Sequence, residues 1–134
     1  MIYEPKPFIM EILTKTIGRF LFAIPFLVFG VFHFMDGSGM VGMVPGWVPG
    51  GLFWVYLTGI ALIAAAISIM LRMMDYLAAV LLGILLLIFV LTIHLPAVAG
   101  GNDGQMPSLL KDLALAGAAW FYAGYAAKDA PAAK

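Results

Sequence analysis

Two histidines and one aspartate lie at the ends of long apolar runs, where ionisable side chains are rare. His33 ends the first run and His94 ends the third, whereas Asp112 lies near the start of the fourth. An imidazole can donate or accept a proton near neutral pH, and a positioned carboxylate can pass one on. With an aromatic ring such as Trp47 nearby, these groups could hold a small hydrogen-bonding ring and exchange protons with it.

Four apolar stretches of membrane length must position these groups. A helix that crosses about 30 Å of hydrocarbon needs about 20 mostly apolar residues, and residues 14–35, 51–71, 74–96 and 108–127 meet this requirement. Lipid offers the backbone no hydrogen-bond partners, so such segments are helices or strands of a closed barrel. The two-residue alternation of barrel strands does not occur here. The sequence therefore predicts an all-α, single-domain membrane bundle of four helices.

The composition excludes several classes of function. Of the 134 residues, 64% are hydrophobic and 10% are charged, and the mean hydropathy is +1.07. Seven basic and seven acidic residues give no net charge, so we expect a lipid bilayer and no nucleic acid as partner. The chain has no cysteine, which excludes thiol nucleophiles, iron–sulfur clusters and covalently attached c-type haem.

The basic residues predict the orientation of the four helices. Cytoplasmic loops are enriched in lysine and arginine, and one side of the predicted topology holds every basic residue except Lys111. That side holds Lys6, Lys15, Arg19, Arg72, Lys128 and Lys134. We therefore expect both termini in the cytoplasm, two loops outside, and a tight hairpin at Arg72.

This topology brings the polar groups together in two places. His33, His94 and Asp112 lie at a similar depth near the outer interface, beside the loop that contains Trp47. Because ionisable groups within spans usually face the bundle interior or a cavity, we predict that these four residues line an outer pocket for a ligand. A second group lies near the inner interface, where a local ion pair is expected between the last two of its members. It comprises Arg19, Arg72 and Asp75.

Helical periodicity supports an inward position for these residues. Small residues on the same stripes would permit close helix packing. The first stripe contains Arg19, Ala23, Phe26, Gly30 and His33. The second contains Tyr76, Gly83, Leu87 and His94. The third contains Asp112, Ala116, Ala119, Ala123 and Ala127.

Each candidate residue also has a purely structural interpretation. A histidine at a helix end can be an interface anchor that hydrogen-bonds to water or to a backbone carbonyl. Asp112 can cap the start of its helix, where a negative charge suits the helix dipole. Lys111 is expected to extend toward the lipid headgroups. From the sequence these alternatives stay open.

Metal and haem centres find little support in the sequence. His33 and His94 at one depth could ligate a b-type haem, but the bulky Phe29, Phe32 and Phe34 beside His33 argue against a haem pocket. A zinc or iron site would need a third ligand from Asp112 or Asp36. We therefore predict no metal site.

An ordered set of short motifs resembles the DoxX family of small bacterial four-helix membrane proteins. The motifs are Gly-Arg-Phe at 18–20, Gly-Val-Phe-His-Phe at 30–34, Val-Pro-Gly-Trp-Val-Pro at 44–49, Thr-Gly-Ile at 58–60 and Leu-Leu-Lys-Asp-Leu-Ala-Leu-Ala-Gly at 109–117. Relatives often carry a glutamate two residues after the glycine of the second span, where this chain has Ala61.

This resemblance implies a location in the bacterial inner membrane and a link to membrane oxidoreductases. The leading hypothesis is then a subunit that interacts with quinone and other redox subunits without being a complete enzyme. His33 and His94 would donate hydrogen bonds to the quinone, Asp112 would relay protons, and Trp47 would stack on the ring. The alternatives are a structural accessory subunit of a larger membrane complex, packed through its alanine stripe, and a binder or carrier of a small solute or lipid.

Overall fold

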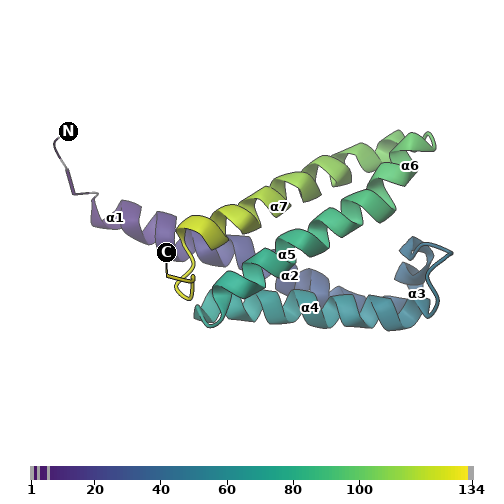
Figure 1. The fold of residues 1–134 in the computed structure, drawn as a ribbon, viewed down its shortest axis with the longest axis horizontal. Coiled ribbons are helices and arrows are strands. Elements are labelled where there is room, and N and C mark those ends of the chain that lie inside the picture. The colour runs from purple at the N-terminus through teal and green to yellow at the C-terminus, as the bar shows by residue number, and fades with distance from the viewer. Residues whose placement is uncertain (1, 3, 6, 133–134) are drawn as a thin grey trace.

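The computed structural model describes residues 2, 4–5 and 7–132, and all regular elements in this part of the chain are helical (Figure 1). The first long helix comprises α1 (Phe8–Glu11), a π-helical stretch (Ile12–Ile17) and α2 (Gly18–Met35). A loop with α3 (Gly37–Met40) and a 3₁₀ turn (Val41–Met43) leads to α4 (Gly51–Leu71). The third long helix comprises α5 (Asp75–Phe89), a π-helical stretch (Val90–His94) and α6 (Leu95–Ala99). A 3₁₀ turn (Asp103–Gln105) precedes α7 (Met106–Tyr125). The all-α prediction is confirmed.

Three helices within the described residues are long and apolar enough to cross a membrane. They are Phe8–Met35, Gly51–Leu71 and Asp75–Ala99. Helix α7 has 20 residues, but Lys111, Asp112 and many alanines and glycines make it less hydropathic than the other three. The 28 residues of the first helix extend about 42 Å at 1.5 Å per residue, so its first turns project beyond the other helices (Figure 1).

The long helices form two packed pairs. Helix α2 packs along α4 and α5 packs along α7, with fewer contacts between α4 and α5. In Figure 1 the pairs meet at the end where both termini lie and diverge toward the end with α3 and α6. The predicted tight hairpin is confirmed: α4 ends at Leu71, α5 begins at Asp75, and Arg72 and Met74 adopt left-handed φ angles of 56° and 54° in the turn.

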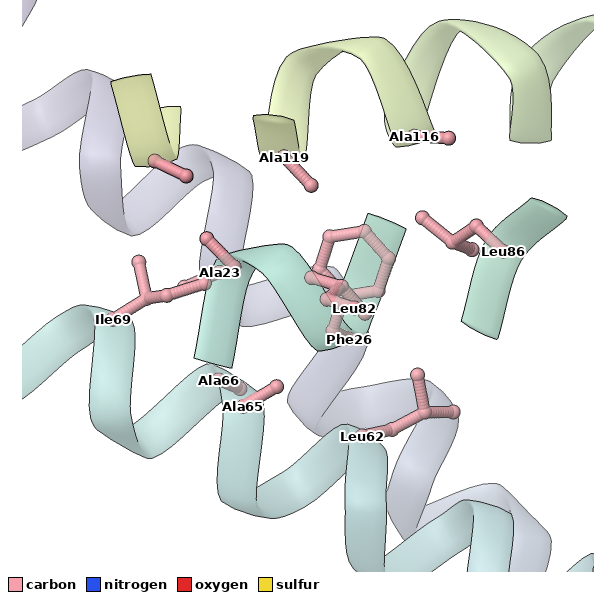
Figure 2. Close-up of a cluster of buried hydrophobic side chains, with 12 residues drawn as sticks. Ala23, Phe26, Leu62, Ala65, Ala66, Ile69, Leu82, Leu86, Ala116 and Ala119 are labelled. Atoms are coloured by element: carbon pink, nitrogen blue, oxygen red, sulfur yellow. The ribbon is translucent and has the colours of Figure 1, made fainter. Parts of the chain in front are cut away.

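The hydrophobic core lies between the pairs, and all four long helices contribute to it. Figure 2 shows these side chains directed toward one another. The core cluster comprises Ala23, Phe26, Leu62, Ala65, Ala66, Ile69, Ala79, Leu82, Leu86, Ala116, Ala119 and Ala123. Many of its members are alanines, so the backbones approach closely, as is usual where lipid rather than water surrounds the helices.

The predicted inward faces hold for α2 and α7 and need correction on α5. The buried residues of α2 include Ala23, Phe26 and Gly30, and those of α7 include Asp112 and three of the predicted alanines. On α5 the buried face runs through Ala79, Leu82, Gly83 and Leu86, whereas Tyr76 and Leu87 lie at its edge. A π turn contains more residues than an α turn, so the stretch that ends at His94 turns this histidine back toward the interior. A constant 100° per residue, counted back from His94, therefore assigns α5 a face that is shifted from the buried one.

Helices α2 and α4 cross at two facing glycines. A Cβ on Gly30 would lie 2.6 Å from Cγ1 of Ile63 and 2.9 Å from the carbonyl oxygen of Gly59. A Cβ on Gly59 would lie 3.0 Å from the carbonyl oxygen of Gly30 and 2.9 Å from Cβ of His33. The two backbones are in contact, and the base of His33 rests on this crossing.

Replacing Gly59 by alanine is therefore expected to lower the free energy of unfolding by about 1–3 kcal/mol, the usual cost of overpacking. The matched control is Gly117→Ala on α7, where an added Cβ meets nothing within 4 Å and helix propensity gains up to about 1 kcal/mol. Unfolding by sodium dodecyl sulfate in mixed micelles, followed by circular dichroism, measures both. Equal stability of the two variants would contradict the close crossing.

Candidate functional site

A cavity of about 770 Å³ lies between the two helix pairs, toward the end where they diverge. Its lining includes all four residues of the predicted outer pocket: His33 from α2, Trp47 from the following loop, His94 from the π-helical stretch and Asp112 from α7. The volume is within the range of about 300–1,000 Å³ that is typical of small-molecule sites. The four residues thus surround one space, and their role in binding stays a prediction.

The cavity is apolar over most of its wall. Aromatic and aliphatic side chains from all four long helices form the wall, among them Phe26, Leu62, Phe89 and Leu115. The ionisable groups in the lining are His33, His94, Lys111 and Asp112. A ligand that fills this space would need an apolar body and a small polar group.

Asp112 pairs with His94 across α7 and the π-helical stretch. The carboxylate is buried, and its Oδ2 lies 3.1 Å from Nε2 of His94, so the imidazole N–H donates to Asp112. On the other side of the ring, Nδ1 lies 2.9 Å from Oε1 of Gln105. A side-chain amide can accept from Nδ1–H or, after rotation, donate to a bare nitrogen, so His94 keeps two partners in either protonation state. Neither the helix cap expected for Asp112 nor the interface anchor expected for His94 describes this pair.

One ring nitrogen of His33 makes the hydrogen bond to a backbone carbonyl that the structural interpretation predicts. Its Nδ1 lies 2.6 Å from the backbone carbonyl oxygen of Phe29, one turn earlier in α2. The hydrogen bond holds the ring against its own helix. Among the described residues no hydrogen bond joins Nε2 of His33 to another protein group, and the residue lines the cavity.

Lys111 belongs to the site, although the sequence assigned it to the headgroup layer. Its Nζ lies 3.7 Å from Oδ1 of Asp112 and 5.4 Å from the centroid of the Phe29 ring. The ammonium group therefore reaches from α7 to α2 across the end of the cavity. The signal that could have revealed it is its position beside Asp112 on a helix whose other face is buried.

Two tryptophans line the cavity, and only one of their rings is fixed by a hydrogen bond. Trp54 donates its indole N–H to the carbonyl oxygen of Pro49 at 2.8 Å, which fixes the ring beside the loop. Trp47 lines the same cavity but is 79% exposed. It therefore sits at the rim, where a ligand can cover it.

The inner polar group serves as a set of helix caps at the opposite end of the molecule. Arg19 donates to the carbonyl oxygens of Ile69, at 3.4 Å, and of Met70, near the end of α4. Arg72 donates to the carbonyl oxygen of Ala126 at 3.1 Å, just after α7. Cations are favourable at helix C-termini because the carbonyl dipoles point toward them.

The expected ion pair between Arg72 and Asp75 is wrong. The left-handed turn directs Arg72 to the end of α7, whereas Asp75 accepts hydrogen bonds from the Tyr122 hydroxyl and from two backbone N–H groups of the C-terminal segment. Among the basic residues used to predict the orientation, Lys6 and Lys134 lie outside the described residues.

A model of one protein family, Domain of unknown function (DUF8561), matches residues 22–123. The chain belongs to this family. The DUF8561 match extends from α2 to α7 and includes all the residues named above as lining the cavity. No curated protein and no solved structure matches the chain.

Membership of DUF8561 overturns the resemblance to DoxX. The quoted motifs are three to nine residues long and rich in glycine, phenylalanine and leucine, which are common in many membrane helices. Their order along the chain follows from four helices with two polar loops and does not identify one family. The functional expectations that depended on DoxX lose that basis, and what remains depends on the cavity.

Proposed function

We propose that this chain is a multi-pass membrane protein that binds a small neutral amphiphile of the quinone class between its helix pairs. The observation that supports this most is the cavity of about 770 Å³, which is mostly apolar and holds four ionisable side chains and two threonines. A quinone with an isoprenoid tail matches such a cavity, since its tail can contact the apolar wall and its ring oxygens can contact the polar groups.

The charges at the polar groups favour a neutral ligand. Lys111 and Asp112 lie 3.7 Å apart and offset each other. A phosphate headgroup would meet one ammonium group already facing a carboxylate, whereas phosphate sites usually combine several cationic groups or backbone N–H groups. Aromatic rings of Phe29, Trp47 and Trp54 in the lining suit a flat ring.

For the membrane arrangement we propose that α7 crosses as a fourth span and that both termini are cytoplasmic. Both ends of the chain lie at one end of the molecule (Figure 1), which supports an even number of crossings. Lys15, Arg19, Arg72 and Lys128 belong to that end by topology, and Lys111 is at the other. The positive-inside rule then assigns the termini to the cytoplasm.

We propose a binding subunit, and other membrane or redox subunits would exchange electrons with its ligand. The accessory-subunit alternative predicted an alanine stripe free to contact a partner. Ala119 and Ala123 of that stripe are 0% and 3% exposed inside this chain. The stripe is thus used in internal packing and does not favour that alternative.

The test is a titration of the purified protein in lipid nanodiscs with a short-chain quinone, read by quenching of tryptophan fluorescence. We expect a saturable component that is lost in large part when Trp47 and Trp54 are replaced by phenylalanine. Trp120 packs on Gly83 and donates to the carbonyl oxygen of Val80, outside the cavity, so Trp120→Phe should leave the saturable component intact. Quenching that only rises linearly with partitioned quinone would contradict the proposal.

His94→Ala should weaken binding of the same quinone about tenfold, which corresponds to about 1.4 kcal/mol. The reason is that Asp112 loses the N–H donor that fixes its carboxylate at 3.1 Å. His94→Gln keeps a side-chain N–H at a similar reach and should retain affinity within about threefold, since one hydrogen bond is preserved. Equal losses in both variants would mean that the imidazole acts only through packing.

A further inference from the structure

The hydrogen bond between His33 and Phe29 fixes which ring nitrogen holds the proton. A carbonyl oxygen can only accept, so Nδ1, at 2.6 Å from it, must be the N–H donor. In the neutral imidazole Nε2 then has a bare lone pair. Toward the cavity, His33 is therefore an acceptor and not the donor that the sequence led us to expect.

The other ionisable groups leave the ligand few donors, and the uncharged donors of the lining include the Thr58 hydroxyl and the Trp47 indole N–H. Both ring nitrogens of His94 already face protein partners, Asp112 and Gln105. Asp112, when ionised, can only accept. Lys111 is the one cationic donor in the lining, and it already faces the carboxylate at 3.7 Å and the ring of Phe29.

We propose that the cavity prefers the hydroxyl-bearing, reduced form of its ligand, a quinol, with one hydroxyl donating to Nε2 of His33. This inference rests on the proposed function. A quinone carbonyl placed against Nε2 would bring two acceptors together and leave both without a donor, whereas a phenolic hydroxyl gives Nε2 the proton it lacks. Binding sites built around one hydrogen bond discriminate against analogues that lack it, because the protein group that faces the ligand is then left unpaired.

The proposal concerns binding alone and includes no electron transfer. The chain has no cysteine, so a chemical reductant that keeps the ligand as quinol cannot alter thiols or disulfides of the protein. Quinol and quinone can therefore be compared on the same preparation.

The experiment is isothermal titration calorimetry in nanodiscs with three short-chain ligands that share one tail: the quinol under anaerobic reducing conditions, the quinone, and the dimethyl ether of the quinol. The ether keeps the reduced ring and lacks the donor. We expect the quinol to bind about tenfold more tightly than either of the others, a typical effect of one missing hydrogen bond. His33→Phe should abolish the difference in affinity between the quinol and the other two ligands, and far-UV circular dichroism of the variant checks that it is folded.

Each other outcome overturns a distinct statement. Equal or tighter binding of the quinone overturns the preference for quinol and leaves the proposed function standing. Tighter binding of quinol that persists in His33→Phe overturns the assignment to His33. Absence of saturable binding for all three ligands overturns the proposed function itself.

Discussion

Replacing Asp75 by alanine is expected to lower the free energy of unfolding by about 2–4 kcal/mol, because three donors lose their acceptor. The Asp75 side chain is completely buried. Its Oδ2 accepts from the Tyr122 hydroxyl at 2.7 Å and from the backbone N–H of Lys128 at 2.9 Å, and its Oδ1 accepts from the backbone N–H of Asp129 at 2.9 Å. One carboxylate thus joins the start of α5 to α7 and to the segment after it.

The segment after α7 also makes a hydrogen bond to the turn between α4 and α5. Oδ2 of Asp129 accepts from the backbone N–H of Met74 at 2.5 Å, and Met74 is one of the two residues with a left-handed φ in the turn. Without the Asp75 carboxylate the segment after α7 is no longer fixed, and the hydrogen bond from Met74 to Asp129 is weakened as well. We therefore expect the C-terminal segment and the hairpin to become less stable together.

Unfolding by sodium dodecyl sulfate in mixed micelles, followed by far-UV circular dichroism, measures this effect. Tyr122→Phe removes one of the three donors and should cost about 1 kcal/mol. Asp103→Ala is the matched control: this aspartate is exposed in the turn before α7, and its loss should change stability by less than about 0.5 kcal/mol. A value for Asp75→Ala as small as that of the control would contradict the capping role.

Filling the cavity with Thr58→Trp is expected to weaken quinone binding at least about tenfold, or about 1.4 kcal/mol. Thr58 is a half-buried residue of α4 that lines the cavity. An indole in its place would occupy the space that we assign to the ligand and would not alter the ionisable groups.

The control for this variant lies two residues further along the same helix. Ile60 is 56% exposed and is not part of the cavity lining, so Ile60→Trp adds the same indole on the outer surface. Calorimetric titration of both variants in nanodiscs, with their thermal unfolding measured in parallel, isolates the effect of the cavity. Similar affinities in two folded variants would place the ligand elsewhere.

The sequence predicted which side of a helix is buried better than it predicted which residues contact one another. The buried residues of α2 and α7 follow directly from the spacing of Ala23, Gly30, Asp112 and Ala116, because a regular α-helix repeats at a constant angle. The buried face of α5 was predicted by counting back from His94, and the π-helical stretch between α5 and His94 shifts that count.

The sequence predicted which residues lie around the cavity but not which hydrogen bonds they make. Depth and topology were enough to bring His33, His94 and Asp112 near one space. The partner of each nitrogen was not predictable, because it depends on the rotamer and on residues such as Gln105 and Lys111 whose types fit a surface equally well. The hydrogen bond from Nδ1 of His33 to the Phe29 carbonyl oxygen changes the role that we propose for His33 from donor to acceptor.

The polar residues near the inner interface also show that sequence spacing does not predict contact partners. Sequence spacing paired Arg72 with Asp75 because they are three residues apart, which is favourable within one helix. The left-handed turn lies between them, so the helical spacing does not apply. Their actual partners, in and after α7, are some fifty residues distant in the chain.

The most direct test of the account is to identify what the protein retains from its own membrane. Wild-type protein and Thr58→Trp are purified in mild detergent, extracted with organic solvent and compared by mass spectrometry. The account predicts a quinone or quinol retained near one molecule per chain by the wild type and depleted in the variant. A wild-type protein that retains no such compound, or a variant that retains the same amount, would contradict the claim that this cavity is a quinone site.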